Sequence, residues 1–77
     1  MTIQEIVGMW AKNALPADLE TLRYMEAEIL AAGMKVLKAI AASTDLPIAE
    51  KLIEEHNLLA DIHACLEIAI NNLLPLA

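Results

Sequence analysis

The sequence has few of the side chains on which nucleophilic enzymes depend. Cys65 is its only cysteine, so an internal disulfide is excluded and an oxidising compartment is disfavoured. Cys65 stands two positions from His63, and on a helix that spacing points the two side chains in different directions. Ser43 is the only serine and lies in a predicted turn. We therefore expect no catalytic nucleophile and predict that the protein is not an enzyme.

Positive charge is equally scarce. Five lysine and arginine residues stand against eleven aspartate and glutamate residues, which gives a net charge of -6. The positive side chains are scattered along the chain, so direct binding to nucleic acid or to an anionic membrane is disfavoured. Arg23 is the only arginine and no glycine-rich turn is present, which disfavours a phosphate-handling enzyme. We predict no bound cofactor.

Long apolar runs are also missing. The longest stretch without a charged residue is Ile68 to Ala77, and it is half as long as the roughly 20 residues that a bilayer-spanning helix requires. The first five residues contain no basic segment followed by an apolar run, so a secretory signal is not expected. These absences predict a cytoplasmic protein with no membrane partner.

What the chain has in abundance is apolar surface. Hydrophobic residues make up 58% of its 77 residues, which is more than one copy of so small a protein buries easily. A chain of this length forms one domain, residues 1–77, whose core is only marginally able to keep it folded. We therefore expect the protein to associate with itself or with another protein.

Apolar residues recur at helical intervals in three segments, which predicts an all-α fold. Thr2 and Glu5 have the spacing of a capping box, and Pro16 and Pro47 mark the beginnings of later helices. The predicted helices span residues 3–13, 16–42 and 47–74. The two long segments are joined by a short turn, so we expect an antiparallel helical hairpin with the short helix folded over it.

Each long segment carries an apolar stripe. In the first, the predicted core residues are Leu19, Leu22, Ile29, Leu30, Gly33, Val36, Leu37 and Ile40. In the second, they are Ile48, Leu52, Leu59, Ile62, Leu66, Ile70 and Leu73. The glycine within the first stripe predicts a close helix contact. Because a hairpin leaves one side open, we expect two copies to pair into a four-helix bundle.

Further apolar side chains are candidates for contacts with a second copy or a partner protein. Ile53 and Ile68 lie on the otherwise polar face of the last predicted helix. The other candidates are Met9, Trp10, Met25 and Met34. Methionine is flexible and tryptophan is enriched at interface centres, so these residues are candidates to form a groove that binds a partner. The favoured interpretation is that they pack in the core.

Polar residues on otherwise apolar faces are the candidates for a binding site. If the turn centres near Thr44 and Asp45, residues equidistant from it lie side by side, which places Glu26 near His63 and Arg23 near Glu67. The favoured interpretation is a polar pair of Glu26 and His63 that fixes the register of the hairpin or the orientation of a dimer.

A metal site is the alternative interpretation of these polar residues, because carboxylate and imidazole ligands from facing helices occur in di-iron bundles. The Glu-x-x-His spacing of those bundles is absent here, however. The candidate ligands are Glu26, His56, His63 and Glu67, with Glu28 and Glu55 as further ones.

The sequence therefore predicts a homodimeric, acidic protein–protein interaction module. Small helical proteins of this shape serve as adaptors, chaperones and inhibitors, including those encoded by phages and mobile elements, and this comparison rests on architecture alone. The alternative function is a metal- or small-ligand-binding helical bundle.

Overall fold

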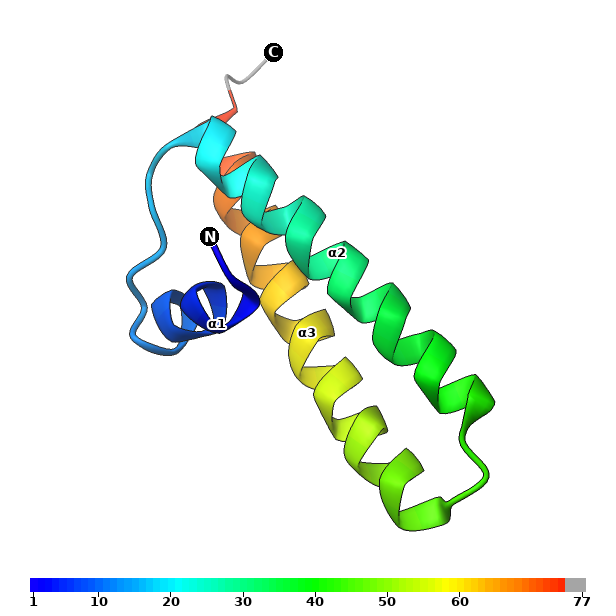
Figure 1. Ribbon diagram of the computed structural model, residues 1–77. Helices are drawn as coiled ribbons and strands as arrows, with labels where there is room; N and C mark the ends of the chain where they lie inside the picture. The colour runs from blue at the N-terminus through cyan, green and yellow to red at the C-terminus, as the bar shows by residue number, and fades with distance from the viewer. Residues whose placement is uncertain (75–77) are drawn as a thin grey trace.

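The computed structural model describes residues 1–74 and contains three α-helices (Figure 1). Helix α1 spans Ile3–Ala11, α2 spans Leu19–Ala42 and α3 spans Leu46–Leu73. No strand occurs within residues 1–74. The predicted all-α fold with one short and two long helices is confirmed.

Each helix begins at a side chain that accepts a hydrogen bond from the first turn. The Thr2 hydroxyl accepts from the Glu5 backbone N–H while the Glu5 carboxylate accepts from the Thr2 N–H, so the predicted capping box is formed. Asp18 and Asp45 are the caps of α2 and α3. Because Asp18 caps α2, the helix begins at Leu19, and the predicted start at residue 16 was wrong.

The helix ends also have local causes. Helix α1 ends at Ala11, two residues earlier than predicted, and Asn13 follows with a φ of 55°. Asparagine tolerates this left-handed conformation better than most residues, and such a residue directs the chain out of the helix. Helix α3 ends at Leu73, with Leu74 as its C-cap.

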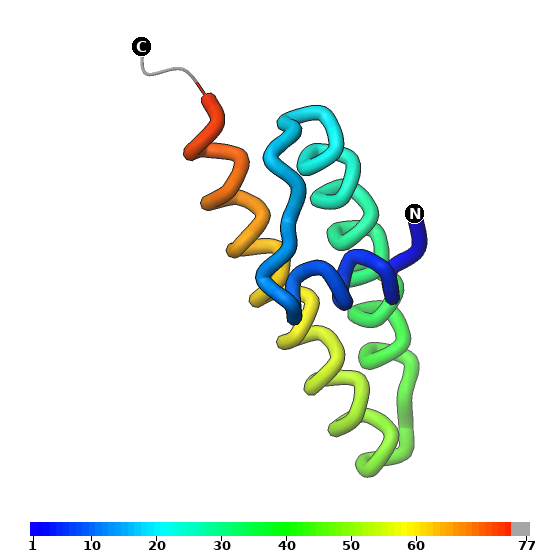
Figure 2. The backbone as a smooth tube through the Cα atoms, turned by 90° about the vertical axis from the view of Figure 1, so that its left-hand side faces the viewer, coloured from blue at the N-terminus to red at the C-terminus, as the bar shows by residue number. Residues whose placement is uncertain are grey.

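Helices α2 and α3 lie side by side and antiparallel along almost their whole length (Figures 1 and 2). The buried residues at their contact are all apolar. They are Leu22, Met25, Ile29 and Val36 from α2, and Leu59, Ile62, Leu66 and Ile70 from α3. Full burial of one such side chain stabilises a fold by about 1.5–3 kcal/mol, so this contact accounts for the hairpin.

Helix α1 crosses the hairpin near its middle and covers one face of it (Figure 2). Ile6 is its only fully buried residue and joins the hairpin core. Ile3, Val7 and Trp10 are partly buried and pack against that core. With nine residues, α1 covers only part of one face, and the opposite face has no covering helix in the described chain.

Several residues predicted for the core lie outside it. Leu30, Leu37 and Ile48 are each about half exposed. A Cβ atom added at Gly33 would meet no heavy atom within 4 Å, so the predicted close contact at this glycine is not made within the chain. The hairpin therefore buries a narrower stripe than the sequence pattern predicted.

The lengths of α2 and α3 raise the question of a membrane span. Within residues 1–74, no helix combines the length and the apolar character that crossing a membrane requires. The charged residues of both helices interrupt their apolar stretches.

Candidate functional site

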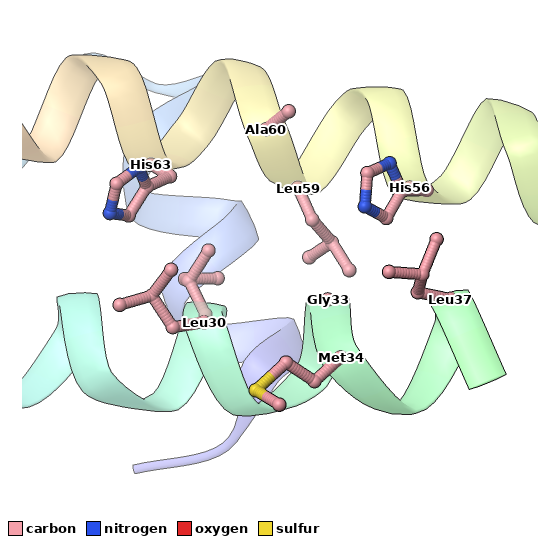
Figure 3. A pocket seen from close by; sticks show the side chains of 9 residues that line it. Leu30, Gly33, Met34, Leu37, His56, Leu59, Ala60 and His63 are labelled. Atoms are coloured by element: carbon pink, nitrogen blue, oxygen red, sulfur yellow. The ribbon is translucent and has the colours of Figure 1, made fainter.

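An apolar groove runs between α2 and α3 on the face opposite α1 (Figure 3). In this view α1 passes behind the two long helices, and no residue of α1 lines the groove. The groove has a volume of about 220 Å³. Ile29 and Leu59 of the core contribute to it, and its other lining residues are Leu30, Gly33, Met34, Leu37, His56, Ala60 and His63.

The groove is bordered by a second stripe on each long helix. Along each stripe the residues are separated by four, three and four positions, which is the spacing of one helix face. On α2 the stripe is Glu26, Leu30, Gly33 and Leu37, and on α3 it is His56, Ala60, His63 and Glu67. The α2 side of the groove is therefore apolar apart from Glu26 at its end, whereas the α3 side carries two histidines, an alanine and a glutamate.

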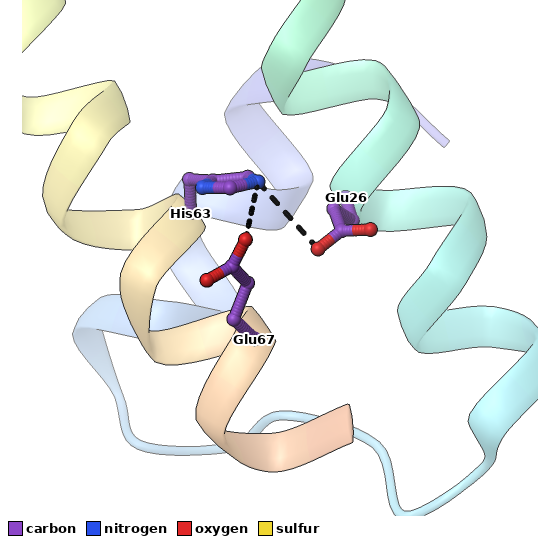
Figure 4. A group of neighbouring side chains, drawn as sticks. All are labelled: Glu26, His63 and Glu67. Atoms are coloured by element: carbon purple, nitrogen blue, oxygen red, sulfur yellow. Dashed lines mark ion pairs between the residues drawn. The ribbon is translucent and has the colours of Figure 1, made fainter. Parts of the chain in front are cut away.

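Three polar side chains gather at the end of the groove that His63 borders (Figure 4). The His63 Nε2 atom lies 3.5 Å from Glu26 Oε2 and 3.5 Å from Glu67 Oε1. The side chains of His63 and Glu26 are 25% and 27% exposed, and that of Glu67 is 56% exposed. The two long helices position this cluster together, since Glu26 comes from α2 and the other two residues come from α3.

The predicted proximity of Glu26 and His63 is confirmed by this contact. No ion pair joins Arg23 and Glu67 among the described residues. Glu67 contacts His63, which lies one turn earlier on the same helix. The cluster is thus built from one imidazole and two carboxylates.

The cluster includes three of the four principal metal candidates. One ligand atom from each of Glu26, His63 and Glu67 lies within 4.8 Å of the others. His56 lies outside this cluster and lines the apolar part of the groove. Glu28 and Glu55, the further candidates, are also outside the cluster.

The interface candidates fall in different places. Met25 is fully buried in the hairpin core, so it is not available to a partner, and Met9 and Trp10 are partly buried against that core. Met34 is 62% exposed and lines the groove. Two further candidates, Ile53 and Ile68, are exposed but do not line it.

Comparison of the chain with protein-family models, with curated proteins and with solved structures gives no match.

Sequence reasoning assigned Leu30 and Leu37 to the hairpin core and did not single out Ala60. The spacing of four, three and four on both helices is the signal that would have placed them on a second face.

Proposed function

We propose that this protein is a protein–protein interaction module that acts as a homodimer, and that two copies meet through the groove between α2 and α3. The observation that carries the proposal is the row of exposed apolar side chains that α2 presents to the groove. Leu30 and Leu37 are about half exposed and Met34 more so, and all three lie on the one face that α1 leaves uncovered. A contiguous apolar surface of this kind is typical of an interaction site.

The distribution of charge favours a second copy as the occupant of this groove. Each chain carries a net charge of -6, so two copies repel one another, and contact through a surface without fixed charge keeps that repulsion smallest. No aspartate, glutamate, lysine or arginine lines the groove. Depletion of charged residues is also typical of the centres of protein interfaces.

The dimensions of the molecule support the same occupant. The chain measures 47 Å along its longest axis and 17 Å along its shortest. A stable protein interface buries about 800 Å² on each partner, so most of one long face would have to take part.

The uncovered face of the hairpin has the position that a four-helix bundle requires for contact with a second hairpin. A helix in such a bundle contacts two neighbouring helices, whereas a helix in an isolated hairpin contacts one. Gly33 and Ala60 are small residues near the middle of the groove, and the space above Gly33 is open. A helix from the second copy could approach the backbone closely at this point.

In this proposal the dimer presents its outer surfaces to a different protein, as an adaptor, a chaperone or an inhibitor. The eleven acidic residues outnumber the five basic ones, and most of them are exposed. This distribution favours a partner with a basic surface. The proposal assigns no catalytic step to the chain.

The test is native mass spectrometry of two matched variants. Met34 and Ile68 are both 62% exposed, and only Met34 lines the groove. Met34→Glu and Ile68→Glu therefore add the same charge at equally exposed positions of the folded chain. We expect the wild-type protein and Ile68→Glu to be dimers. Met34→Glu should weaken dimerisation at least about a hundredfold, because burying an unpaired charge costs several kcal/mol.

Circular dichroism of both variants would verify that they keep the helical content of the wild type. A monomeric wild-type protein would contradict the proposal. Dissociation by Ile68→Glu but not by Met34→Glu would place the interface on the outer face of α3, where Ile53 and Ile68 were predicted to make contacts, and would overturn the role of the groove.

A further inference from the structure

In the cluster of Glu26, His63 and Glu67, the imidazole lies at a metal-ligand spacing from each carboxylate, and the ligand atoms of the two glutamates lie within 4.8 Å of one another. Zinc binds nitrogen at 2.0–2.1 Å and carboxylate oxygen at 2.0–2.2 Å with tetrahedral angles, so neighbouring ligand atoms lie about 3.4 Å apart. His63 Nε2 lies 3.5 Å from an oxygen of each glutamate. These separations exceed the usual 2.7–3.2 Å of an N–H···O hydrogen bond.

The arrangement of the three ligand atoms favours a bound cation over a hydrogen bond from His63 to the glutamates. The Nε2 atom of a histidine carries at most one hydrogen, which can point to only one carboxylate at a time. Here both carboxylates converge on that same nitrogen. A metal ion bound between the three atoms would neutralise both carboxylates and accept the lone pair of the imidazole at once.

The scaffold holds the cluster across two helices. Glu26 projects from α2, while His63 and Glu67 are four residues apart on α3, which is one helical turn. His63 and Glu26 are each about three-quarters buried, so the packed hairpin restricts their side chains. The cluster therefore differs from a group of acidic residues that share one exposed surface.

We propose that Glu26, His63 and Glu67 bind one divalent transition-metal ion of the zinc type and thereby link α2 to α3. Imidazole together with carboxylate suits zinc and neighbouring transition metals, whereas magnesium and calcium prefer oxygen ligands alone. Three protein ligands leave one tetrahedral position for water or another small ligand. The site rests on the hairpin of one chain and does not depend on the proposed dimer.

The test is isothermal titration calorimetry with ZnCl₂, and with MgCl₂ as the comparison, after removal of metal with a chelator. The protein should carry no affinity tag with histidines, and Cys65→Ala should be present in every sample so that its thiol cannot bind zinc. We expect one zinc ion per chain and no saturable magnesium binding. Zinc should also raise the thermal unfolding midpoint, because the ion binds the folded chain only.

Matched variants separate this site from general binding to an acidic protein. Glu67→Gln and His63→Gln should each weaken zinc binding at least about tenfold, since each removes a ligand. Glu55→Gln and His56→Gln remove the same groups from α3 outside the cluster and should leave the affinity within about twofold. Equal affinity in the two sets, or no saturable zinc binding by the parent protein, would overturn the proposal.

The same titration of Met34→Glu separates this proposal from that of dimerisation. Met34 lies outside the cluster, so one zinc ion per chain is expected whether or not two copies associate. Loss of zinc binding with Met34→Glu would mean that the site needs the second copy and would contradict a site within one hairpin.

Discussion

At the scale of single residues, two methionines on α2 show that some apolar side chains of the hairpin are buried and others are left exposed. Met25 is fully buried, whereas Met34 is 62% exposed in the groove. Both were predicted as possible partner contacts on the same chemical grounds. Of the two, only Met34 lies where it can contact a partner.

The two methionines give a direct test of this division. Met25→Ala should reduce the free energy of unfolding by about 2–5 kcal/mol, because it removes buried atoms and leaves a cavity. Met34→Ala should change it by only about 0.5 kcal/mol in the monomer, because little is buried there. Urea unfolding at a concentration that keeps the chain monomeric measures both. Equal losses in the two variants would show that Met25 is not part of the core.

Periodicity predicted part of this residue-level pattern and missed the rest. It placed Leu22, Ile29 and Val36 in the core correctly, because they lie along the centre of the stripe. It did not distinguish the two flanks, where Met25 is buried and Leu30 is half exposed. The packing of α1 on one face of the hairpin makes that distinction, and it depends on contacts between residues far apart in the sequence.

The candidate site could be predicted in part for a similar reason. Counting residues from the turn placed Glu26 beside His63, since an antiparallel hairpin fixes which residues lie opposite one another. The same count placed Arg23 near Glu67, whereas the contact of Glu67 with His63 is indicated by their one-turn spacing along α3. A count along the chain does not describe the rotamers of long side chains, and Glu67 contacts the residue one turn earlier instead.

At the scale of the helices, capping side chains explain where each element begins. Proline is favoured in a first helical turn, so Pro16 was a reasonable predicted start for α2. The Asp18 carboxylate instead accepts hydrogen bonds from Thr21, and the helix begins after it. In α3 the two signals agree, because Pro47 follows directly within the first turn that Asp45 caps.

The caps of α1 and α2 make the protein less stable at acidic pH. Hydrogen bonds from the Thr21 side chain and then its backbone lower the pKa of Asp18 below the ordinary 3.8. The Thr2 backbone and then its hydroxyl lower the pKa of Glu5 below 4.5. Each ionised carboxylate therefore stabilises the folded state above its ordinary pKa, and that contribution is lost as the pH falls through the lowered value.

We expect the thermal midpoint of the wild type to fall as the pH drops below about 4.5, partly through Asp18. Asp18→Asn keeps a residue that caps helices well but removes the titrating group, so its midpoint should fall less over the same range. Circular dichroism at a series of pH values measures the difference. Parallel curves for the two proteins would show that ionisation of Asp18 does not stabilise α2.

At the scale of the whole molecule, one face of the hairpin is covered by α1 and the other carries the groove (Figures 2 and 3). The high apolar content predicted association, but composition does not say which face takes part. The position of α1 leaves Leu30, Met34 and Leu37 uncovered, and the metal-binding cluster that we propose borders the same groove. Dimerisation and metal binding would therefore act on neighbouring parts of one face.

The central claim is that two copies meet at this groove, and an isotope-filtered nuclear Overhauser experiment tests it most directly. A mixture of ¹³C-labelled and unlabelled chains reports only contacts between different chains. The account predicts intermolecular signals from the methyl groups of Leu30, Met34 and Leu37. Their absence in a dimeric sample, with signals from Ile53 and Ile68 instead, would contradict it.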